Sequence, residues 1–406
     1  MINVVFGVVT VAALVLVAAL ILRLIPAVGR AVLDDPPADR DAALDGLRGV
    51  LALSVFLHHG IIAHAYDGGQ PWAAPPSNFD NLVGDGAVAL FFMITAYLFW
   101  GRVVARGGRL GWGRFFRRRI GRLAPMFYLA VGLLFAIVAV DSGFVLRVPV
   151  ATLAEQLVRW LGFALLGFPT INGVTAPYAI LGTVWSLGYE WIFYLALPIA
   201  ALAYAKLGRD WPLWLALFAF SMTDADLAFY AFFATRCVAV HIVRYRTHTA
   251  VWAAAGGASL AILVGFFHDI AGPLQALLLL PVFVAALHAV GPWAVLRCRP
   301  LGYLGRISYS VYLLHQPIIH MATAWLIGFA AYAALDRVAL YGVIVLIGSV
   351  VMALSTVTFL VVEKPFLAGG RPERLRARDA AASNETPPPL PDPAAVTGPP
   401  GSRTWC

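Results

Sequence analysis

The chain has 406 residues, of which 61% are hydrophobic and only 12% are charged. Its mean hydropathy is +0.81, which excludes a water-soluble globular protein, because such a protein needs far more charge on its surface. The composition therefore predicts a polytopic membrane protein. The net charge of +8 is, in such a protein, first of all a signal of orientation. We expect the lipid bilayer as a partner and no nucleic acid.

Three cysteines, Cys237, Cys298 and Cys406, lie far apart in the sequence and form no CxxC spacing. Neither a disulfide framework nor a thiolate metal site is expected from this arrangement. We predict no metal site.

Hydrophobic stretches long enough to cross a bilayer recur along the chain. The first, residues 4–27, has no basic segment ahead of it, so we expect a retained transmembrane helix and no cleaved signal peptide. The other predicted spans are 47–65, 86–103, 123–141, 152–168, 183–204, 226–243, 249–267, 272–290, 306–330 and 338–362. The sequence thus predicts an all-α fold with about eleven transmembrane helices. Segment 211–221 is too short to span and is expected to be re-entrant or interfacial.

The charges of the loops predict the orientation. Residues 102–122 contain eight arginines, which places this loop in the cytoplasm. If the chain changes sides at each of the eleven predicted spans, the loops that contain Arg244 and Arg297 also lie in the cytoplasm. The N-terminus is then outside and the C-terminus cytoplasmic. Lys206 and Arg209 fall outside by this count, against the rule.

The chain loses its hydrophobicity from Ala368 onward and ends in a proline-rich stretch, which we expect to be disordered. We find no internal repeat. The sequence therefore predicts three parts, an extra N-terminal helix within residues 1–30, a membrane domain over 44–367 and a cytoplasmic tail over 368–406.

Two polar residues, Arg48 and His59, stand eleven positions apart in an otherwise apolar run. At 3.6 residues per turn they return to nearly the same helix face, about 16 Å apart along the axis. A neutral imidazole in such surroundings can accept a proton from a hydroxyl. The alternative is a histidine that only forms a hydrogen bond between helices. His58 points about 100° away, and we expect it to be a packing or orienting residue.

A second polar stripe consists of Ser308, Tyr312 and His315, at positions i, i+4 and i+7 of a predicted helix. Such a lining suits sugar hydroxyls or a thioester carbonyl, and interhelical hydrogen bonds explain it equally well. His315 and His59 each lie about 13 to 16 Å from the inner end of their helices. Their common depth predicts a shared cavity.

Two further groups of charges are candidates. Glu190 is embedded among aromatic residues, so we expect it to be paired with a cation or a histidine. Arg118, Arg119 and Arg122 begin a helix, and anchoring on anionic lipid accounts for them. Clustered guanidinium groups are also what a pyrophosphate or a 3′-phosphate needs.

Taken in chain order, these pieces form a pattern: Arg48-x10-His59, VALFFMITAYL over 88–98, Arg118-Arg119-x2-Arg122, Trp185-Ser186-x3-Glu190, Ser308-Tyr309-x2-Tyr312-x2-His315 and Glu363-Lys364-Pro365. Over about residues 44–367 it resembles the acyltransferase 3 family of bacterial membrane O-acyltransferases, in the stand-alone form without a C-terminal esterase-like domain. The family's usual ten helices make the first helix of this chain an extra one. Thr95 and Ala96 stand where the family has Ser and Gly.

The resemblance implies transfer of an acyl group, commonly acetyl from acetyl-CoA, to a hydroxyl of a carbohydrate or glycolipid acceptor. It implies an enzyme of the bacterial inner membrane with no permanently bound cofactor. His59 matches the essential histidine and Arg48 its partner, and we expect Glu190 to assist them. The residues expected to bind the CoA phosphates are Arg118, Arg119 and Arg122. Those expected to line the substrate cavity are Trp185, Ser186, Ser308, Tyr309, Tyr312 and His315.

A transporter is the rival interpretation, with the buried His, Glu and Arg residues as a proton or substrate relay. The absence of repeated halves and the richness of the arginine loop argue against it. The acceptor, the acyl chain, the oligomeric state, and the choice between direct transfer and an acyl-enzyme stay open.

Overall fold

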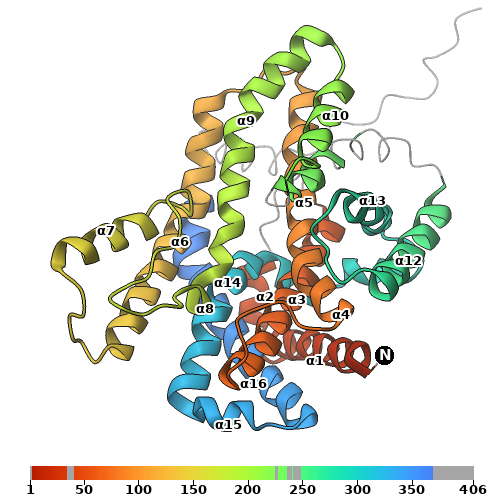
Figure 1. The fold of residues 1–406 in the computed structure, drawn as a ribbon. Helices are drawn as coiled ribbons and strands as arrows, with labels where there is room; N and C mark the ends of the chain where they lie inside the picture. Colours follow the sequence, from red (N-terminus) through yellow and green to blue (C-terminus); the bar gives the residue numbers. More distant parts are fainter. Residues whose placement is uncertain (1, 34–40, 225–226, 236–239, 241–247, 369–406) are drawn as a thin grey trace, which may run out of the picture.

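The computed structural model describes residues 2–33, 41–224, 227–235, 240 and 248–368 (Figure 1). This part of the chain consists of helices and loops, without a β-strand apart from a single bridge between Ile171 and Val174. The predicted all-α class is confirmed.

Seven helical segments of the described residues are long and apolar enough to cross a membrane. They are Ile2–Leu24 (α1), Ala42–Asp67 (α3), Asn78–Ala105, which ends in α5 (Ala87–Ala105), Trp112–Asp141 (α6), Tyr178–Leu207, which ends in α9 (Trp185–Leu207), Thr249–Phe266 (α12), and Arg337–Leu367, which begins with α16 (Arg337–Thr358). An eighth candidate is the pair Pro273–His288 (α13) and Gly291–Arg297 (η4), bent by 66°. The protein is therefore a multi-pass membrane protein, as its composition predicts, whereas the number of about eleven spans is not confirmed.

Apart from α14 (Arg299–Met321), which has 23 residues, the remaining elements are short. They are α2 (Pro26–Leu33), α4 (Asn78–Asn81), η1 (Leu82–Gly86), α7 (Val150–Trp160), α8 (Tyr178–Leu181), η2 (Gly182–Val184), α10 (Trp211–Phe220), η5 (Ala322–Ile327), α15 (Phe329–Ala333), η6 (Phe359–Glu363) and α17 (Lys364–Ala368). As expected of segment 211–221, α10 is too short to span, with 10 residues.

At the centre of the bundle, α3 packs along α14 (Arg299–Met321). Both helices are buried along most of their length. Glycines let their backbones approach, since a Cβ atom at Gly49 would lie 2.7 Å from the carbonyl oxygen of Leu301, and one at Gly305 would collide with the backbone of Asp45. Small residues at such contacts are typical of helix pairs in membranes. The two helices that contain the predicted histidines are thus held face to face.

The predicted span 152–168 is not formed. Instead, α7 has only 11 residues, about 16 Å at 1.5 Å per residue, and projects from the side of the bundle (Figure 1). Most of its side chains are exposed, Gln156 and Trp160 being the buried ones. A loop follows that contains Gly162 and Gly167, so the apolar run does not continue as a helix.

Because this span is missing, α9 runs in the direction opposite to the one predicted. Its final turns lie against the arginine-rich turn after α5, where a Cβ atom at Gly108 would lie 2.6 Å from the carbonyl oxygen of Ala201. Close by, the indole of Trp100 donates a hydrogen bond of 2.7 Å to Asp210. Lys206 and Arg209 therefore lie at the same end of the bundle as the eight arginines of 102–122. The expectation that they lie at the opposite end is wrong, and the corrected arrangement obeys the positive-inside rule.

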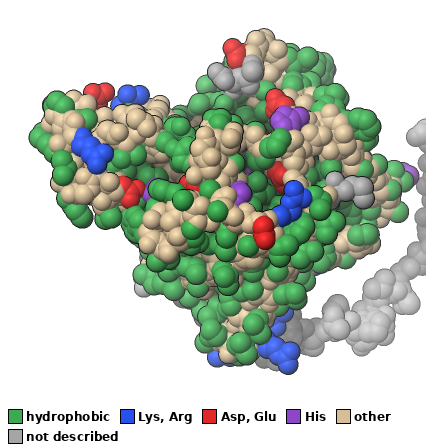
Figure 2. Space-filling model, turned by 60° about the horizontal axis from the view of Figure 1, so that its bottom comes forward, with side chains coloured by type: hydrophobic (Ala, Val, Ile, Leu, Met, Phe, Trp, Pro, Cys, Tyr) green, Lys and Arg blue, Asp and Glu red, His purple; other side chains and the backbone are tan. Residues whose placement is uncertain are grey.

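We call the end of the bundle that contains the eight arginines of 102–122 the basic end, and the end that contains Asp80 and Asp141 the acidic end. The basic end contains the arginine-rich turn, and there the amine of Lys364 donates to the carbonyl of Ala31 at 2.8 Å. At the acidic end, Asn3 donates to Asp80 at 2.7 Å. Figure 2 brings the lower end of the bundle in Figure 1 forward and shows separate acidic, basic and histidine side chains on a mainly hydrophobic surface. The first helix thus starts at the acidic end, and the last described helix lies at the basic end.

Two predictions lie partly or wholly outside the described residues. The predicted span 226–243 includes 236–239 and 241–243, and the predicted disordered tail includes 369–406. Both stay predictions.

Candidate functional site

A cavity of about 280 Å³ lies among α3, α5, α6, α9 and α14. Most of the predicted site residues line it: Arg48, Arg119, Arg122, Ser186, Glu190, Ser308, Tyr309 and Tyr312. These residues come from four helices far apart in the sequence. The structure thus brings the separate predicted groups into one site.

Four predicted residues do not line the cavity. Arg118 is exposed, since successive residues of a helix point about 100° apart and the neighbouring Arg119 takes the inward position. Trp185 packs in an aromatic cluster with Phe92 and Phe229. The other two, His59 and His315, lie beyond the inner end of the cavity.

Arginines gather where the cavity approaches the basic end. The guanidinium carbon of Arg119 lies 4.7 Å from the centre of the Phe99 ring, and that of Arg102 lies 5.5 Å from it, both within the range of cation–π contacts. Arg48, on α3, is accompanied by Asp45 at 4.0 Å. The guanidinium groups are thus held around the cavity by ring faces and a carboxylate.

The carboxylate of Glu190, on α9, lines the same cavity. It accepts hydrogen bonds from the hydroxyl of Tyr194 and, at 3.4 Å, from that of Thr95. Arg119 has both Glu190 and Tyr194 among its electrostatic neighbours. Arg119 is thus a cation near Glu190, and the expected pairing stays a prediction. Thr95 keeps a hydroxyl group where the family has Ser, and here that hydroxyl positions the carboxylate.

Hydroxyl groups of α9 and α14 line the inner end of the cavity. The hydroxyls of Tyr312 and Ser186 are 2.8 Å apart, and Tyr312 also donates to the carbonyl of Thr183 at 3.1 Å. The side chain of Gln316 accepts from the backbone N–H of Thr183 at 2.7 Å. We call Tyr312 and Ser186 the floor of the cavity. It joins α14 to the start of α9.

Directly beyond the floor lie the two histidines. The ring centres of Tyr312 and His315 are 6.1 Å apart, and Nε2 of His315 lies 3.1 Å from Nδ1 of His59. Each histidine also has its Nδ1 atom 3.0 Å from the carbonyl oxygen four residues earlier, Val55 for His59 and Val311 for His315. The equal depth expected for the two residues is what the structure shows. They meet directly across the α3–α14 contact.

His59 is the more accessible of the pair, because His315 is 0% exposed whereas His59 is half-buried. Trp72, in the loop after α3, stacks on His59 with ring centres 6.0 Å apart. His58 is held elsewhere, with Nδ1 2.7 Å from the carbonyl oxygen of Asp80. Its ring fills the space in which a side chain of Gly84 would lie. His58 is therefore a packing residue, and His59 is the more exposed of the two.

Residues 41–354 match the sequence model of the acyltransferase 3 family, described as an acyltransferase domain. The chain belongs to this family. No curated protein and no solved structure matches it. The match begins at Asp41, the N-cap of α3, whose side chain accepts from the N–H of Ala43 at 2.8 Å, and it ends within α16. The site therefore lies in the matched part, and α1 and α2 precede it.

Family membership makes the protein a membrane acyltransferase. It removes the support for the transporter interpretation, because Arg48, Arg119 and Glu190 line a cavity of an acyltransferase domain. Among the described residues, no three His, Cys, Asp or Glu side chains are grouped as metal ligands would be.

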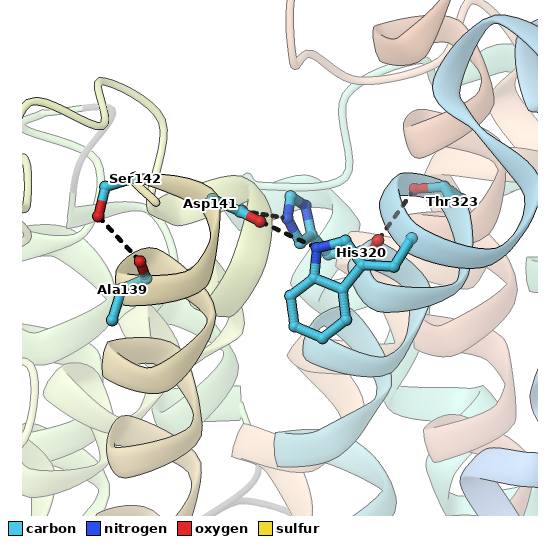
Figure 3. Close-up of polar contacts among 6 residues, drawn as sticks. Ala139, Asp141, Ser142, His320 and Thr323 are labelled. Carbon is cyan, nitrogen blue, oxygen red and sulfur yellow. Dashed lines mark hydrogen bonds and ion pairs between the residues drawn. The ribbon is translucent and has the colours of Figure 1, made fainter. Parts of the chain in front are cut away.

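At the acidic end, a polar contact fastens α14 to α6 (Figure 3). Nε2 of His320 lies 2.8 Å from a carboxylate oxygen of Asp141, and the indole of Trp325 donates to the other oxygen at 3.0 Å. His320 is five positions after His315 on α14. The contact thus fixes α14 beyond the histidine pair.

Several residues of the site were not singled out from the sequence. Arg102 was interpreted only as a topology signal, although it lines the cavity. Asp45 and Tyr194 lie three and four positions from Arg48 and Glu190, a spacing that places them on the same helix faces. Trp72 had no recognisable signal, because its contact with His59 depends on the path of a loop.

Proposed function

We propose that this membrane acyltransferase transfers an acyl group, acetyl in the first instance, from acyl-CoA to a hydroxyl group of a carbohydrate or glycolipid acceptor. The observation that carries the proposal is the order of groups along one axis. Arginines surround the cavity toward the basic end, hydroxyls form its floor, and a histidine pair lies directly beyond.

The basic part of the cavity suits the donor. Arg119 and Arg122 line this part, and guanidinium groups can form the charge-assisted, bidentate contacts that CoA phosphates need. The cavity, at about 280 Å³, is near the lower limit of ligand pockets, which hold about 300 to 1,000 Å³. We therefore place the pantetheine arm inside and the nucleotide at the mouth, where Arg118 is exposed. Arg48 and Glu190 balance charge and orient the arm between the mouth and the floor.

We assign the acyl-transfer step to His59. As general base it takes the proton of the acceptor hydroxyl while the oxygen attacks the thioester carbonyl carbon. The carbon–sulfur bond breaks, and the CoA thiolate receives a proton. In the alternative route His59 itself accepts the acyl group and passes it on. Both routes require the floor residues Tyr312 and Ser186 to move apart, because they separate the cavity from the histidines.

The acceptor is expected from the acidic end, which His59 faces with Trp72 stacked on its ring. Aromatic side chains with polar neighbours suit a saccharide, which has both apolar and hydroxyl surfaces. Under the positive-inside rule the basic end lies in the cytoplasm of a bacterial inner membrane, with the N-terminus outside. Donor and acceptor then reach His59 from opposite sides.

Donor binding tests the first half of the proposal. CoA titrated calorimetrically into the purified protein is expected to bind more weakly, by tenfold or more, to Arg119→Gln/Arg122→Gln, since charge-assisted contacts contribute about 1.5–3 kcal/mol each. The matched control is Arg114→Gln/Arg117→Gln, which removes the same charge from exposed positions of the same helix. Equal weakening in both variants would mean that CoA senses only the net charge.

Release of the free CoA thiol tests the second half. His59→Ala is expected to insert and bind CoA like the parent protein but to release no CoA in the presence of acceptor. A folded His59→Ala protein with the parental rate would remove His59 from the mechanism. An acyl group found on His59 by mass spectrometry would select the covalent route.

A further inference from the structure

The histidine pair has a definite proton arrangement, which follows from its neighbours. A carbonyl oxygen only accepts hydrogen bonds. Because Nδ1 of His315 lies 3.0 Å from the carbonyl of Val311, that nitrogen carries the proton. A neutral His315 then has a bare Nε2, and this atom lies 3.1 Å from Nδ1 of His59.

The same reasoning fixes His59. Its Nδ1 faces two acceptors, the carbonyl of Val55 at 3.0 Å and the bare Nε2 of His315. Nδ1 of His59 therefore carries a proton, and Nε2 carries the lone pair. In the reverse arrangement His315 would donate to His59 and leave two bare nitrogens against two carbonyl oxygens. That arrangement loses both intrahelical hydrogen bonds and gains none.

Hydrogen bonds of the described residues engage only the Nδ1 atom of His59. Its Nε2 is thus the nitrogen left to accept a proton from a substrate. When it does so, the ring becomes positively charged, and the Nδ1–H group becomes a stronger donor to His315. A neutral imidazole as the acceptor avoids a carboxylate in the membrane interior, where an anion is costly.

We propose that His315 is the positioning residue of this site, accepting a hydrogen bond from Nδ1 of His59 so that Nε2 of His59 acts as the base. The proposal rests on the function proposed above and assigns His315 a place behind the catalytic histidine, instead of in the substrate cavity. His315 is 0% exposed, packs edge-on against Phe56 with ring centres 6.4 Å apart, and has its other nitrogen held by its own helix. It is therefore a fixed acceptor.

The competing explanation is a simple interhelical hydrogen bond that stabilises the α3–α14 pair. It predicts that loss of His315 lowers stability and leaves the turnover of the folded protein unchanged. Positioning predicts a loss of kcat with little change in the KM for the acyl donor, because the arginines and the cavity are not altered. The two explanations thus differ in a kinetic quantity.

The variants are chosen to separate these explanations. His315→Leu removes the acceptor, and His315→Gln places an amide oxygen near the position of Nε2. We expect His315→Leu to lower kcat about 10- to 100-fold, the range for a hydrogen bond to a charged group. His315→Gln is expected to recover a large part of that loss. The control is His64→Leu, which removes a hydrogen bond of 3.2 Å between α3 and the carbonyl of Leu335 and should keep the parental kcat.

A second measurement does not depend on activity. In protein labelled with ¹⁵N-histidine, a ¹⁵N–¹⁵N coupling across the hydrogen bond is expected between a protonated nitrogen of His59 and a bare nitrogen of His315, absent from His315→Leu. Absence of this coupling in the parent protein, or a proton on Nε2 of His315, would overturn the proposal. So would equal kcat values for the parent and His315→Leu, or for His315→Leu and His315→Gln. If His59→Ala proved active while the coupling was present, the proposed function would fail and the proton arrangement would stand.

Discussion

The close contact of α3 and α14 predicts that one methyl group disturbs the active site from a distance. Gly305 lies on α14 against the backbone of Asp45, where a Cβ atom would collide with main-chain atoms. A backbone cannot yield as a flexible side chain does, so Gly305→Ala must push the two helices apart. His315 lies ten positions further along the same helix, about 15 Å away, and its hydrogen bond to His59 at 3.1 Å depends on that contact.

The magnitude follows from two opposing effects. Alanine in place of glycine favours a helix by about 1 kcal/mol, and overpacking costs about 1–3 kcal/mol. Gly302 is the matched control, since a Cβ atom there meets no atom within 4 Å. Gly302→Ala is therefore expected to be neutral or stabilising, and Gly305→Ala to be less stable than Gly302→Ala by the cost of overpacking. The rate of acyl transfer is likewise expected to be lower for Gly305→Ala than for Gly302→Ala.

The assay is thermal unfolding of both variants in one detergent, together with the rate of CoA release at saturating donor. A lower Tm and a lower rate are expected for Gly305→Ala alone. If Gly305→Ala unfolded at the same temperature as Gly302→Ala and turned over at the parental rate, the α3–α14 contact would not control the site, and this reasoning would be refuted.

Three further predictions concern the walls and the ends of the bundle. Arg119→Gln is expected to raise the KM for acyl-CoA by tenfold or more, and Arg118→Gln by about threefold or less, because an exposed charge is screened; the reverse order in donor kinetics would place the phosphates elsewhere. Asp141→Asn weakens the contact of Figure 3 between α6 and α14, so the free energy of unfolding in detergent should fall by about 1–2 kcal/mol while the KM for the donor stays the same. An unchanged Tm would show that this contact does not stabilise the bundle. Thr95→Val removes the hydroxyl that faces Glu190 at 3.4 Å and should lower kcat, whereas Thr95→Ser should keep it; equal rates for both variants would show that the hydroxyl has no part.

The sequence predicted the depth of the histidines because depth depends only on counting residues along a helix. Their contact could not be predicted in this way, since it requires α3 and α14 to approach through Gly49 and Gly305. That Arg119 and not Arg118 points inward could likewise not be predicted from the sequence, because it depends on how α6 is rotated against its neighbours. Composition and motif order thus suffice to predict the fold class and the family, whereas the packing of helices side by side determines which residues line the site.

The error at 152–168 has a physical cause. The run is apolar on average, but Glu155 and Arg159 lie one turn apart and Gly162 and Gly167 follow, so a long buried helix is not favoured. In α14, by contrast, polar residues lower the hydropathy of a helix that is buried against other helices. Average hydropathy therefore overestimates the tendency of 152–168 to form a spanning helix, and it does not report how deeply α14 is buried.

We propose that an acyl donor enters from the basic end and is used by His59. The most direct measurement uses sealed vesicles that contain the protein in one known orientation, with labelled acetyl-CoA supplied on one side only and the acceptor on the other. Labelled acceptor is expected only when the donor faces the arginine-rich end, and none is expected with His59→Ala. Equal labelling from either side, or parental labelling with folded His59→Ala, would contradict it.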